Sequence, residues 1–421
     1  MSTQAAGNGA ANPTSAETPV APAPRPNAHH DVLIVGGGTA GLTVAARLRR
    51  ARPSLGVAVI EPSDQHYYQP LWTLVGGGVM PREVTARNEA DVMPGGVTWI
   101  RDRVAAFDPE ANAVETAGGR RIGYGQLVVA AGIQVNWDGI PGLKESIGRH
   151  GVCSNYSYEH VPYTWECIRG MRSGNAIFTQ PKGSIKCGGA PQKILYLAED
   201  YFRSRSKVRD DVKVIFAAPG DSIFGVEKYR VPLEKRVADG EIDTMFGHHL
   251  VEIRGEERVA VLERVADEER IEINYEMMHV TPPMSAPKFI AESPLANEEG
   301  WVEADQFTMR HPRFGNVWAL GDCAGLPASK TGAAVRKQAP VVVKNMLAVL
   351  DDRRLEAAYN GYSSCPVVTG YGRLVLAEFD YDGQPAESFP FNQAKERRSM
   401  YLMKKHLLPL LYWQGMLKGR A

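Results

Sequence analysis

The stretch DVLIVGGGTAGLTVAARL at residues 31–48 decides the fold of this chain. It opens with a short, mostly apolar and β-branched run, which is typical of a buried parallel strand, and the apolar residues after the glycines recur at helical spacing. A second β-branched run at 57–60 ends at Glu61, twenty positions beyond Gly41. This order of strand, glycine turn, helix, strand and acid predicts a dinucleotide-binding unit.

Each glycine of this stretch has a separate structural role. Gly36 permits the tight turn, Gly38 lets the backbone approach a pyrophosphate, and Gly41 allows the helix to pack closely on the strand. The free N–H groups at the helix start favour phosphate, and the Glu61 carboxylate can accept a hydrogen bond from a ribose hydroxyl. Because the flanking elements agree with the glycine pattern, we predict a bound dinucleotide rather than an ordinary glycine-rich loop.

The composition limits the functions open to the chain. Its 421 residues, 44% of them hydrophobic, can bury more than one core, so we expect two or three domains. Lys plus Arg and Asp plus Glu both number 48, so no overall charge favours nucleic acid. Five cysteines do not make a disulfide scaffold at this length, so a functional pair would be redox-active. The pair His248 and His249 has no further ligand at a suitable spacing, so we predict no metal site.

The two ends of the chain differ in character. Residues 1–28 are rich in Ala, Pro, Ser, Thr and Asn and lack the features of a targeting signal, so we predict a disordered leader. No run reaches the roughly 18 apolar residues of a membrane span. From Lys395 onward, seven basic residues face one acid and alternate with apolar and aromatic residues such as Tyr412 and Trp413. This pattern indicates a helix lying in a membrane surface, kinked or divided at Pro409; the alternative is a helix packed in a core or a dimer.

A second β-α-β unit follows in the middle of the chain. Strands are predicted at 175–180 and 212–216, on either side of a helix at 190–205. The turn at 181–190 has no dinucleotide fingerprint and carries Cys187 instead. This departure argues against NADH or NADPH as the electron donor.

A late strand and helix supply further cofactor contacts. Residues 126–132 and 316–320 are predicted to be buried strands, and Asp322 after the second of them can accept a hydrogen bond from a ribityl hydroxyl. A helix at 333–350 begins after Lys330. Its start can donate to the side of a flavin ring where negative charge gathers on reduction; the alternative is a plain structural turn.

Several short motifs together resemble the flavoprotein disulfide reductases. Within that group they resemble the sulfide:quinone oxidoreductase family, in the subgroup that includes the mitochondrial enzyme. The resemblance covers residues 29–417, and its two cysteine motifs are the most specific part. The motifs are GGGTAG at 36–41, EPS at 61–63, YYQP at 67–70, KCGGAPQK at 186–193, LGDC at 320–323, SKT at 329–331 and GYSSCP at 361–366.

With the pattern of elements, this resemblance implies an α/β fold of two Rossmann-like, doubly wound domains, the first split in sequence, plus a C-terminal amphipathic membrane-surface segment. Residues 29–150 and 300–360 would bind FAD noncovalently, and residues 151–299 would form the second domain, which carries Cys187. Residues 361–421 would carry Cys365 and contact quinone and membrane. We therefore predict these cofactor-binding residues: Gly36, Gly38, Thr39, Ala40, Gly41, Glu61, Gln69, Val104, Gly132, Asp322, Lys330 and Thr331.

The resemblance also implies an activity for two distant cysteines. Cys187 and Cys365 lie 178 positions apart, each in a turn-like setting beside glycine or proline. Hydrosulfide is a nucleophile that can open a disulfide by exchange. By resemblance, Cys365 would hold the sulfane sulfur and Cys187 would be the thiolate that faces the flavin. Electrons from hydrogen sulfide would pass to a membrane quinone, and the sulfur would pass to a small acceptor such as sulfite, cyanide, a thiol or another sulfide.

For two further residues, Cys153 and Lys186, two interpretations stay open. Cys153 lies near the place where bacterial relatives carry a third active cysteine, and it either takes part in catalysis or is a partly buried spectator. Lys186 either lowers the pKa of Cys187 through its charge or is solvated. Cys167 and Cys323 are expected to be small buried hydrophobic residues.

Two rival functions stay open. One is an NADH:quinone reductase of similar architecture, which would need a second glycine fingerprint near residues 180–190. The other is a flavin-containing binding protein whose cysteines are structural. For the enzyme we expect a peripheral position on the inner, cytoplasmic membrane of a bacterium, and the sequence leaves the oligomeric state open.

Overall fold

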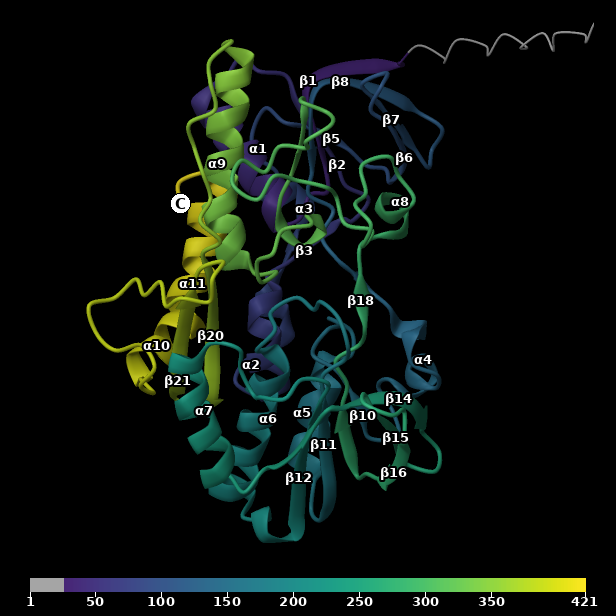
Figure 1. The fold of residues 1–421 in the computed structure, drawn as a ribbon, viewed down its shortest axis with the longest axis vertical. Helices are drawn as coiled ribbons and strands as arrows, with labels where there is room; N and C mark the ends of the chain where they lie inside the picture. Colours follow the sequence, from purple (N-terminus) through teal and green to yellow (C-terminus); the bar gives the residue numbers. More distant parts are fainter. Residues whose placement is uncertain (1–25) are drawn as a thin grey trace, which may run out of the picture.

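The computed structural model describes residues 26–421, which form an elongated α/β molecule with a mixed, mostly parallel sheet at one end and a parallel sheet at the other (Figure 1). Residues 1–25 of the predicted leader lie outside the described part of the chain. The core of the first sheet follows from the apolar run of residues 32–35, whose side chains are all buried between neighbouring strands. The strand ends directly before the glycine turn, so the sequence places that turn at the carboxyl edge of the sheet.

The first sheet is completed by a strand from late in the chain. β1 pairs in parallel with β2 and β8, β2 pairs with β5, and β8 pairs with β19. β6 and β7 form an antiparallel ribbon, and β7 joins it to the sheet by pairing with the beginning of β8. The strands are β1 (Ala28–Val35), β2 (Val57–Ile60), β5 (Thr98–Ile100), β6 (Val104–Asp108), β7 (Ala113–Thr116), β8 (Arg121–Val129) and β19 (Val317–Ala319).

The second sheet is fully parallel and carries a separate antiparallel meander. Its strand order is β10-β17-β11-β12-β13, and the meander order is β14-β15-β16. The strands are β10 (Val152–Cys153), β11 (Gly174–Thr179), β12 (Val212–Ala218), β13 (Asp243–Phe246), β14 (His248–Arg254), β15 (Val259–Arg264), β16 (Arg270–Asn274) and β17 (Met277–His279). A two-stranded link, β9 (Gln134–Val135) with β18 (Met284–Ser285), lies between the two sheets, where the chain leaves the first unit and returns to it (Figure 1).

Helices cover both sheets. In the first unit α1 packs against α9, and in the second α6 follows β11. The longer helices are α1 (Thr39–Ala51), α5 (Val161–Gly170), α6 (Ala190–Tyr201), α7 (Glu227–Asp239) and α9 (Gly332–Leu350). The shorter elements are β3 (Gln65–Tyr67), α2 (Trp72–Gly76), β4 (Ala86–Asn88), α3 (Glu89–Val92), α4 (Leu143–Ser146) and α8 (Lys288–Ala291).

The last part of the chain crosses the junction of the two units. A hairpin of β20 (Ser363–Gly370) and β21 (Arg373–Phe379) packs on α6, and a helical segment over 398–418 runs beside it (Figure 1). The segment contains α10 (Arg398–Leu402) and α11 (Leu408–Leu410), separated by a wider π-helical turn at 403–407. Pro409 has no N–H to give to the preceding turn, and the wide turn before it lets the helix continue. The segment is therefore neither broken nor sharply divided at Pro409.

The predicted α/β class with two Rossmann-like sheets, the first built from two separate stretches, is confirmed. The limits at residues 150 and 300 stay predictions. Within residues 26–421, no helix combines the length and apolar character that a membrane span requires.

Candidate functional site

A cavity of about 1040 Å³ opens at the carboxyl edge of the first sheet and extends to the C-terminal helical segment. It is at the upper end of the ~300–1,000 Å³ that ligand pockets usually measure, so it has room for a large cofactor. Every predicted cofactor-binding residue except Gly41 and Val104 lines it, and so does Cys187. Val104 lies buried in β6 instead, in the antiparallel part of the sheet.

The glycine loop has the tight packing and the open backbone that the predicted phosphate site requires. Gly36 has a φ of 102°, and a Cβ on it would lie 2.5 Å from the carbonyl oxygen of Ala130. A Cβ on Gly41 would lie 1.9 Å from the carbonyl oxygen of Gly36, which explains why Gly41 packs the helix but does not line the cavity. Gly38 has open space where its Cβ would be, and no side chain caps the helix that begins after it. The backbone at Gly38 therefore leaves room and free N–H groups for a phosphate.

Glu61 lies at the expected strand end and holds the loop in place. Its carboxylate accepts hydrogen bonds from the N–H groups of Gly37 at 2.8 Å and Ser63 at 2.7 Å, and burial raises its pKa. A second carboxylate lies beside it. Glu89 is buried, receives one hydrogen bond from His66 at 3.0 Å, and leaves its Oε1 atom without a partner within the described residues. An unpaired buried carboxylate oxygen on the cavity wall is a place for a hydroxyl donor of a dinucleotide.

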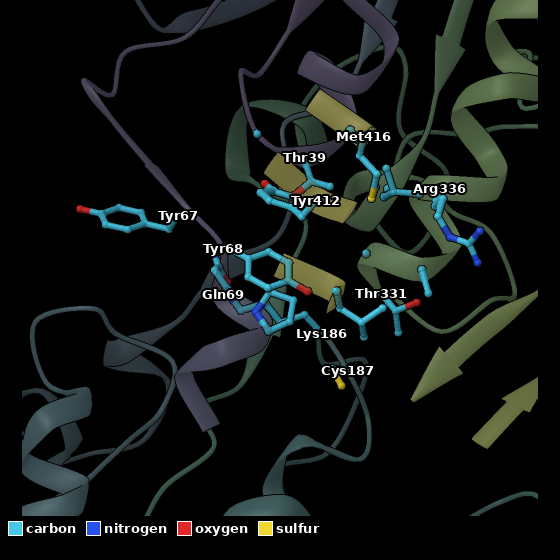
Figure 2. A pocket seen from close by; sticks show the side chains of 18 of the residues that line it. Thr39, Tyr67, Tyr68, Gln69, Lys186, Cys187, Thr331, Arg336, Tyr412 and Met416 are labelled. Carbon is cyan, nitrogen blue, oxygen red and sulfur yellow. The ribbon is translucent and has the colours of Figure 1, made fainter. Parts of the chain in front are cut away.

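The fingerprint loop is also tied to the end of the chain. A hydrogen bond of 2.9 Å joins the hydroxyls of Thr39 and Tyr412, and Tyr412 also bonds His66 Nε2 at 2.5 Å (Figure 2). With the bond from His66 to Glu89, this forms one buried chain of polar groups. Sequence analysis missed His66 and Glu89, because neither lies in a motif and their partner Tyr412 comes more than 300 residues later.

The two predicted cysteines meet at the junction of the two units. Their Sγ atoms are 3.8 Å apart. Cys187 lies between β11 and α6, where its N–H donates to the carbonyl oxygen of Lys330 at 2.8 Å, and Cys365 lies in β20. Cys187 has a φ of 56°, a strained value for a residue with a side chain. The fold thus holds Cys187 in an unfavourable conformation to bring its sulfur toward Cys365 and the cavity.

A buried lysine, Lys193, favours the charged form of one of these two cysteines. Lys193 is 3% exposed, and its Nζ atom donates to Cys187 Sγ at 2.9 Å. The hydrogen bond from Cys365 and the charge of Lys193 hold the pKa of Cys187 well below its usual value, although burial opposes this. The same contact with Cys187, together with burial, raises the pKa of Cys365. The arrangement favours a thiolate on Cys187 and a thiol on Cys365.

Two further lysines lie near this pair. Lys186 does not contact sulfur: its Nζ donates to Gln69 Oε1 at 2.5 Å, and burial lowers its pKa to about 8. Lys404 is 3% exposed and donates to the carbonyl oxygen of Pro70 at 3.0 Å, and burial lowers its pKa to about 7. Of the two interpretations left open for Lys186, a role in lowering the pKa of Cys187 is not supported by a contact, and Lys193 is the residue that bonds this sulfur. Lys404, which the sequence pattern assigned to the membrane-facing charges, is in fact buried.

The start of α9 lies opposite these residues. Thr331 caps the helix by accepting a hydrogen bond from the N–H of Ala334 at 3.1 Å. Lys330 donates to the carbonyl oxygens of Asp322 at 2.8 Å and Ala324 at 3.2 Å, which fixes the turn after β19. Figure 2 shows Thr331 close to Lys186 and Cys187, so the helix start and the cysteine share one part of the cavity.

The remaining candidates lie away from this site. Cys153 is buried in β10 with its thiol 3.5 Å from the carbonyl oxygen of Met278, and Cys323 is buried against Val129; neither lines the cavity. The ring of His249 contacts the strand partner Glu263. Across residues 26–421, no group of three or more His, Cys, Asp or Glu side chains has the arrangement of a metal site.

Comparison with known proteins first shows the class of protein that this chain resembles. A family model described as pyridine nucleotide-disulphide oxidoreductase matches residues 30–164, the part that contains the glycine loop. The crystal structure of the sulfide:quinone oxidoreductase from the bacterium Aquifex aeolicus has the same fold, with a TM-score of 0.80 at 19% identity, and covers 93% of this chain and 92% of that one.

Two relatives then give the family. The mitochondrial sulfide:quinone oxidoreductase of Mus musculus is 45% identical over 393 residues, which cover 93% of this chain and 87% of that protein. The mitochondrial protein of the same name from Dictyostelium discoideum is 45% identical and covers 92% of this chain and 86% of its own length. This chain therefore belongs to the sulfide:quinone oxidoreductase family.

The family implies a flavin cofactor, and the open glycine loop, the free helix start and the unpaired Glu89 oxygen fit one. One expectation is wrong. We expected the inner membrane of a bacterium, but these relatives are mitochondrial proteins, which contradicts a bacterial location.

Proposed function

We propose that this protein is an FAD-dependent sulfide:quinone oxidoreductase. The observation that carries the proposal is the meeting of Cys187 and Cys365, 3.8 Å apart, beside the ammonium group of Lys193 at the wall of a dinucleotide-sized cavity. FAD would be held by the glycine loop, by Glu61 and Glu89, and by the start of α9. When bound, it would take an electron pair from the cysteine site and pass it to a quinone.

The sulfur chemistry rests on thiol–disulfide exchange. In the oxidised protein, hydrosulfide attacks the sulfur of Cys365; a new S–S bond forms, the Cys187–Cys365 bond breaks, and Cys187 leaves as the thiolate. Lys193 supports this direction of attack because its charge stabilises the leaving thiolate on Cys187. Cys365 then carries a persulfide, whose outer sulfur passes to a small nucleophilic acceptor such as sulfite, a thiol or another sulfide.

The quinone side is supported by the C-terminal helical segment. Leu407, Leu408, Leu410 and Leu411 line the cavity, and Leu407 and Leu410 are also 55% and 57% exposed to solvent. An apolar cavity wall that continues onto an apolar surface suits a ligand dissolved in lipid. We infer that the protein binds a membrane surface through this segment and takes up quinone there.

A steady-state assay with separate donors tests this function. The purified holoenzyme should reduce a short-chain ubiquinone analogue with sulfide as donor, and it should not do so with NADH. Sulfite, cyanide, glutathione and sulfide, supplied one at a time, identify the sulfur acceptor by the increase in rate. Reduction with NADH but not with sulfide would contradict the proposal and favour an NADH:quinone reductase.

A further inference from the structure

The hairpin of β20 and β21 turns neighbouring residues toward opposite faces. Side chains alternate across a strand, and directly paired residues of two strands share a face. Cys365 and its partner Ala377 face α6, where a Cβ on Gly189 would lie 2.6 Å from Cys365 Sγ. The next pair, Ser364 and Glu378, faces the other way and lines the cavity. A carboxylate therefore lies one residue from the cysteine site but on the opposite side of the hairpin.

This separation matters for protons, given the proposed function on which the inference rests. Oxidation of one H2S to sulfane sulfur releases two electrons and two protons, and reduction of one quinone to quinol takes up two electrons and two protons. The electron pair passes through the cofactor. One proton can accompany it as a hydride equivalent, but the other must reach the second quinone oxygen from a donor on the cavity side of the hairpin.

Glu378 lies on the cavity side of the hairpin, where its carboxyl group is buried and fully hydrogen-bonded. Its residue is 4% exposed. It accepts hydrogen bonds from the hydroxyl of Tyr362, from the N–H and hydroxyl of Ser388 at 2.7 and 3.2 Å, and from Nε2 of Gln393 at 2.9 Å. Tyr362 and Ser388 line the cavity with it. A tyrosine hydroxyl thus lies between a buried carboxyl group and the space that a quinone would enter.

Polar groups that reach the surface lie beside Glu378, but they contact its carboxylate only through the side-chain amide of Gln393. Tyr229 of α7 donates to the carbonyl oxygen of Glu378 at 3.0 Å and lies 3.3 Å from Glu387 Oε1. Glu387 also accepts from the backbone N–H of Gln393, and it pairs at 2.9 Å with Lys228, whose side chain is 37% exposed.

Charged groups also approach from α9. Arg336 and Lys337 lie 6.0 and 5.4 Å from the centre of the Tyr362 ring, and both line the cavity. Tyr359 also contacts the pair, because its hydroxyl donates to the carbonyl oxygen of Tyr362 at 2.6 Å. The titratable and charged groups around Tyr362 and Glu378 are thus Tyr229, Tyr359, Glu387, Lys228, Arg336 and Lys337.

We propose that Tyr362 and Glu378 form the proton donor for the quinone. When the cavity is open to solvent, Glu378 takes up a proton there and becomes the hydrogen-bond donor to the Tyr362 oxygen. The hydroxyl hydrogen of Tyr362 then points into the cavity. As the electron pair arrives, the Tyr362 O–H bond breaks, a new O–H bond forms on the quinone, and the Glu378 proton moves to Tyr362. One solvent proton is consumed in each turnover, and Tyr362 and Glu378 end unchanged.

The test separates the two halves of the reaction in the holoenzyme. Wild type, Tyr362→Phe, Glu378→Gln and, as a matched control, the exposed carboxylate variant Glu356→Gln are reduced anaerobically with sulfide. Each is then mixed with a short-chain ubiquinone analogue in H2O and in D2O. The first two variants should reduce with sulfide at the wild-type rate but reoxidise ~100-fold more slowly, which is a common loss for a general acid. The control should match wild type in both steps.

Binding and pH dependence distinguish proton donation from a structural role. The affinity for a non-reducible quinone analogue should stay within about twofold in Tyr362→Phe, and the solvent isotope effect and pH dependence of reoxidation seen in wild type should be lost. Wild-type reoxidation rates in both variants, or an equal loss in the sulfide step, would overturn the proton-donor role alone. Failure of sulfide to reduce wild type would instead overturn the proposed function. Because Tyr362→Phe keeps the shape of the side chain, this variant alone decides the test if Glu378→Gln does not fold.

Discussion

Lys193 and Cys187 form a contact of 2.9 Å in which a buried ammonium group stabilises a thiolate. Lys193→Met removes the charge and keeps the length of the side chain. Because an opposite charge at this distance usually lowers a pKa by one to three units, the variant should raise the apparent pKa of Cys187 by more than about one unit. The measurement is the pH dependence of alkylation of the reduced protein with iodoacetamide.

The matched control for this experiment is Lys186→Met. Lys186 is next to Cys187 in sequence, but its Nζ atom bonds Gln69 and not sulfur. Its removal should therefore shift the alkylation profile much less. An equal shift in the two variants would show that general positive charge, and not the specific contact, sets the state of the thiol.

Lys404 gives the stability of the protein a distinct pH dependence. Burial lowers its pKa to about 7, whereas the unfolded chain keeps a value near 10.5. Between these values the unfolded chain holds a proton that the folded chain has released, so this group makes stability rise with pH, by at most about 1.4 kcal/mol per unit. Unfolding of wild type and Lys404→Met in urea at pH 7 and pH 9 measures the effect. Wild type should gain stability relative to the variant at pH 9; a constant difference would show that Lys404 is not neutral in the folded protein.

At the scale of single residues, the functional residues in local motifs could be predicted from the sequence, whereas the residues that they contact in the fold could not. The glycine loop, Glu61 and the two cysteines lie in short patterns that carry their own chemical meaning. Lys193 ends the KCGGAPQK motif, but it lies in a helix, where a lysine is usually solvated, and only the contact with Cys187 shows its role. Glu89 and His66 depend on Tyr412, and no spacing rule relates positions that distant.

Among the elements, the C-terminal helical segment is held to the cofactor loop by one tyrosine. Tyr412 bonds Thr39 and His66, and all three lie in or beside the cavity. Tyr412→Phe would leave the buried ring of His66 and the half-buried hydroxyl of Thr39 without this partner, and a buried polar group that loses its partner costs about 1–3 kcal/mol. Amide hydrogen exchange over residues 398–418 should therefore become faster in the variant, while exchange in β11 and β12 stays unchanged. Unchanged exchange in 398–418 would show that other contacts hold the segment.

The helices and strands themselves were largely predictable, because hydrophobic residues recur along them at the spacing typical of a helix or a strand. The helix predicted at 190–205 is α6 followed by a wider turn, and the strand predicted at 316–320 contains β19. The continuity of helix through Pro409 was not predictable, because it depends on the wide turn at 403–407. The burial of Lys404 within a basic run depends on contact with Pro70, which lies far away in sequence.

For the molecule as a whole, an exposed apolar patch on the C-terminal segment predicts membrane binding. The patch consists of Leu402, Leu407 and Leu410, which are 45%, 55% and 57% exposed. Replacing all three with Ser should abolish cosedimentation with phospholipid vesicles and leave the melting temperature nearly unchanged, because these side chains are not in the core. Val231→Ser is the matched control, since Val231 is 58% exposed on α7 and should not contribute. Equal binding by the triple variant and wild type would contradict this membrane surface.

The overall architecture was predictable, but the orientation of the two faces of the β20–β21 hairpin was not. The glycine fingerprint and the second β-α-β unit predict two parallel sheets, and the family resemblance predicts that a late segment completes the first. The positions of the hairpin faces, with Cys365 on one side and Glu378 on the other, follow only from the strand register. The hydrophobic pattern and the turn at residues 371–372 set that register, but which face meets α6 follows only from the folded structure.

The central claim is that two distant cysteines relay electrons from sulfide to the flavin. Anaerobic titration of the purified holoenzyme with sulfide, followed by flavin absorbance, tests it most directly. We expect prompt bleaching in wild type and none in Cys187→Ser or Cys365→Ser, with flavin still bound in both variants. Bleaching by sulfide at the wild-type rate in both variants, or bleaching by NADH and not by sulfide, would contradict it.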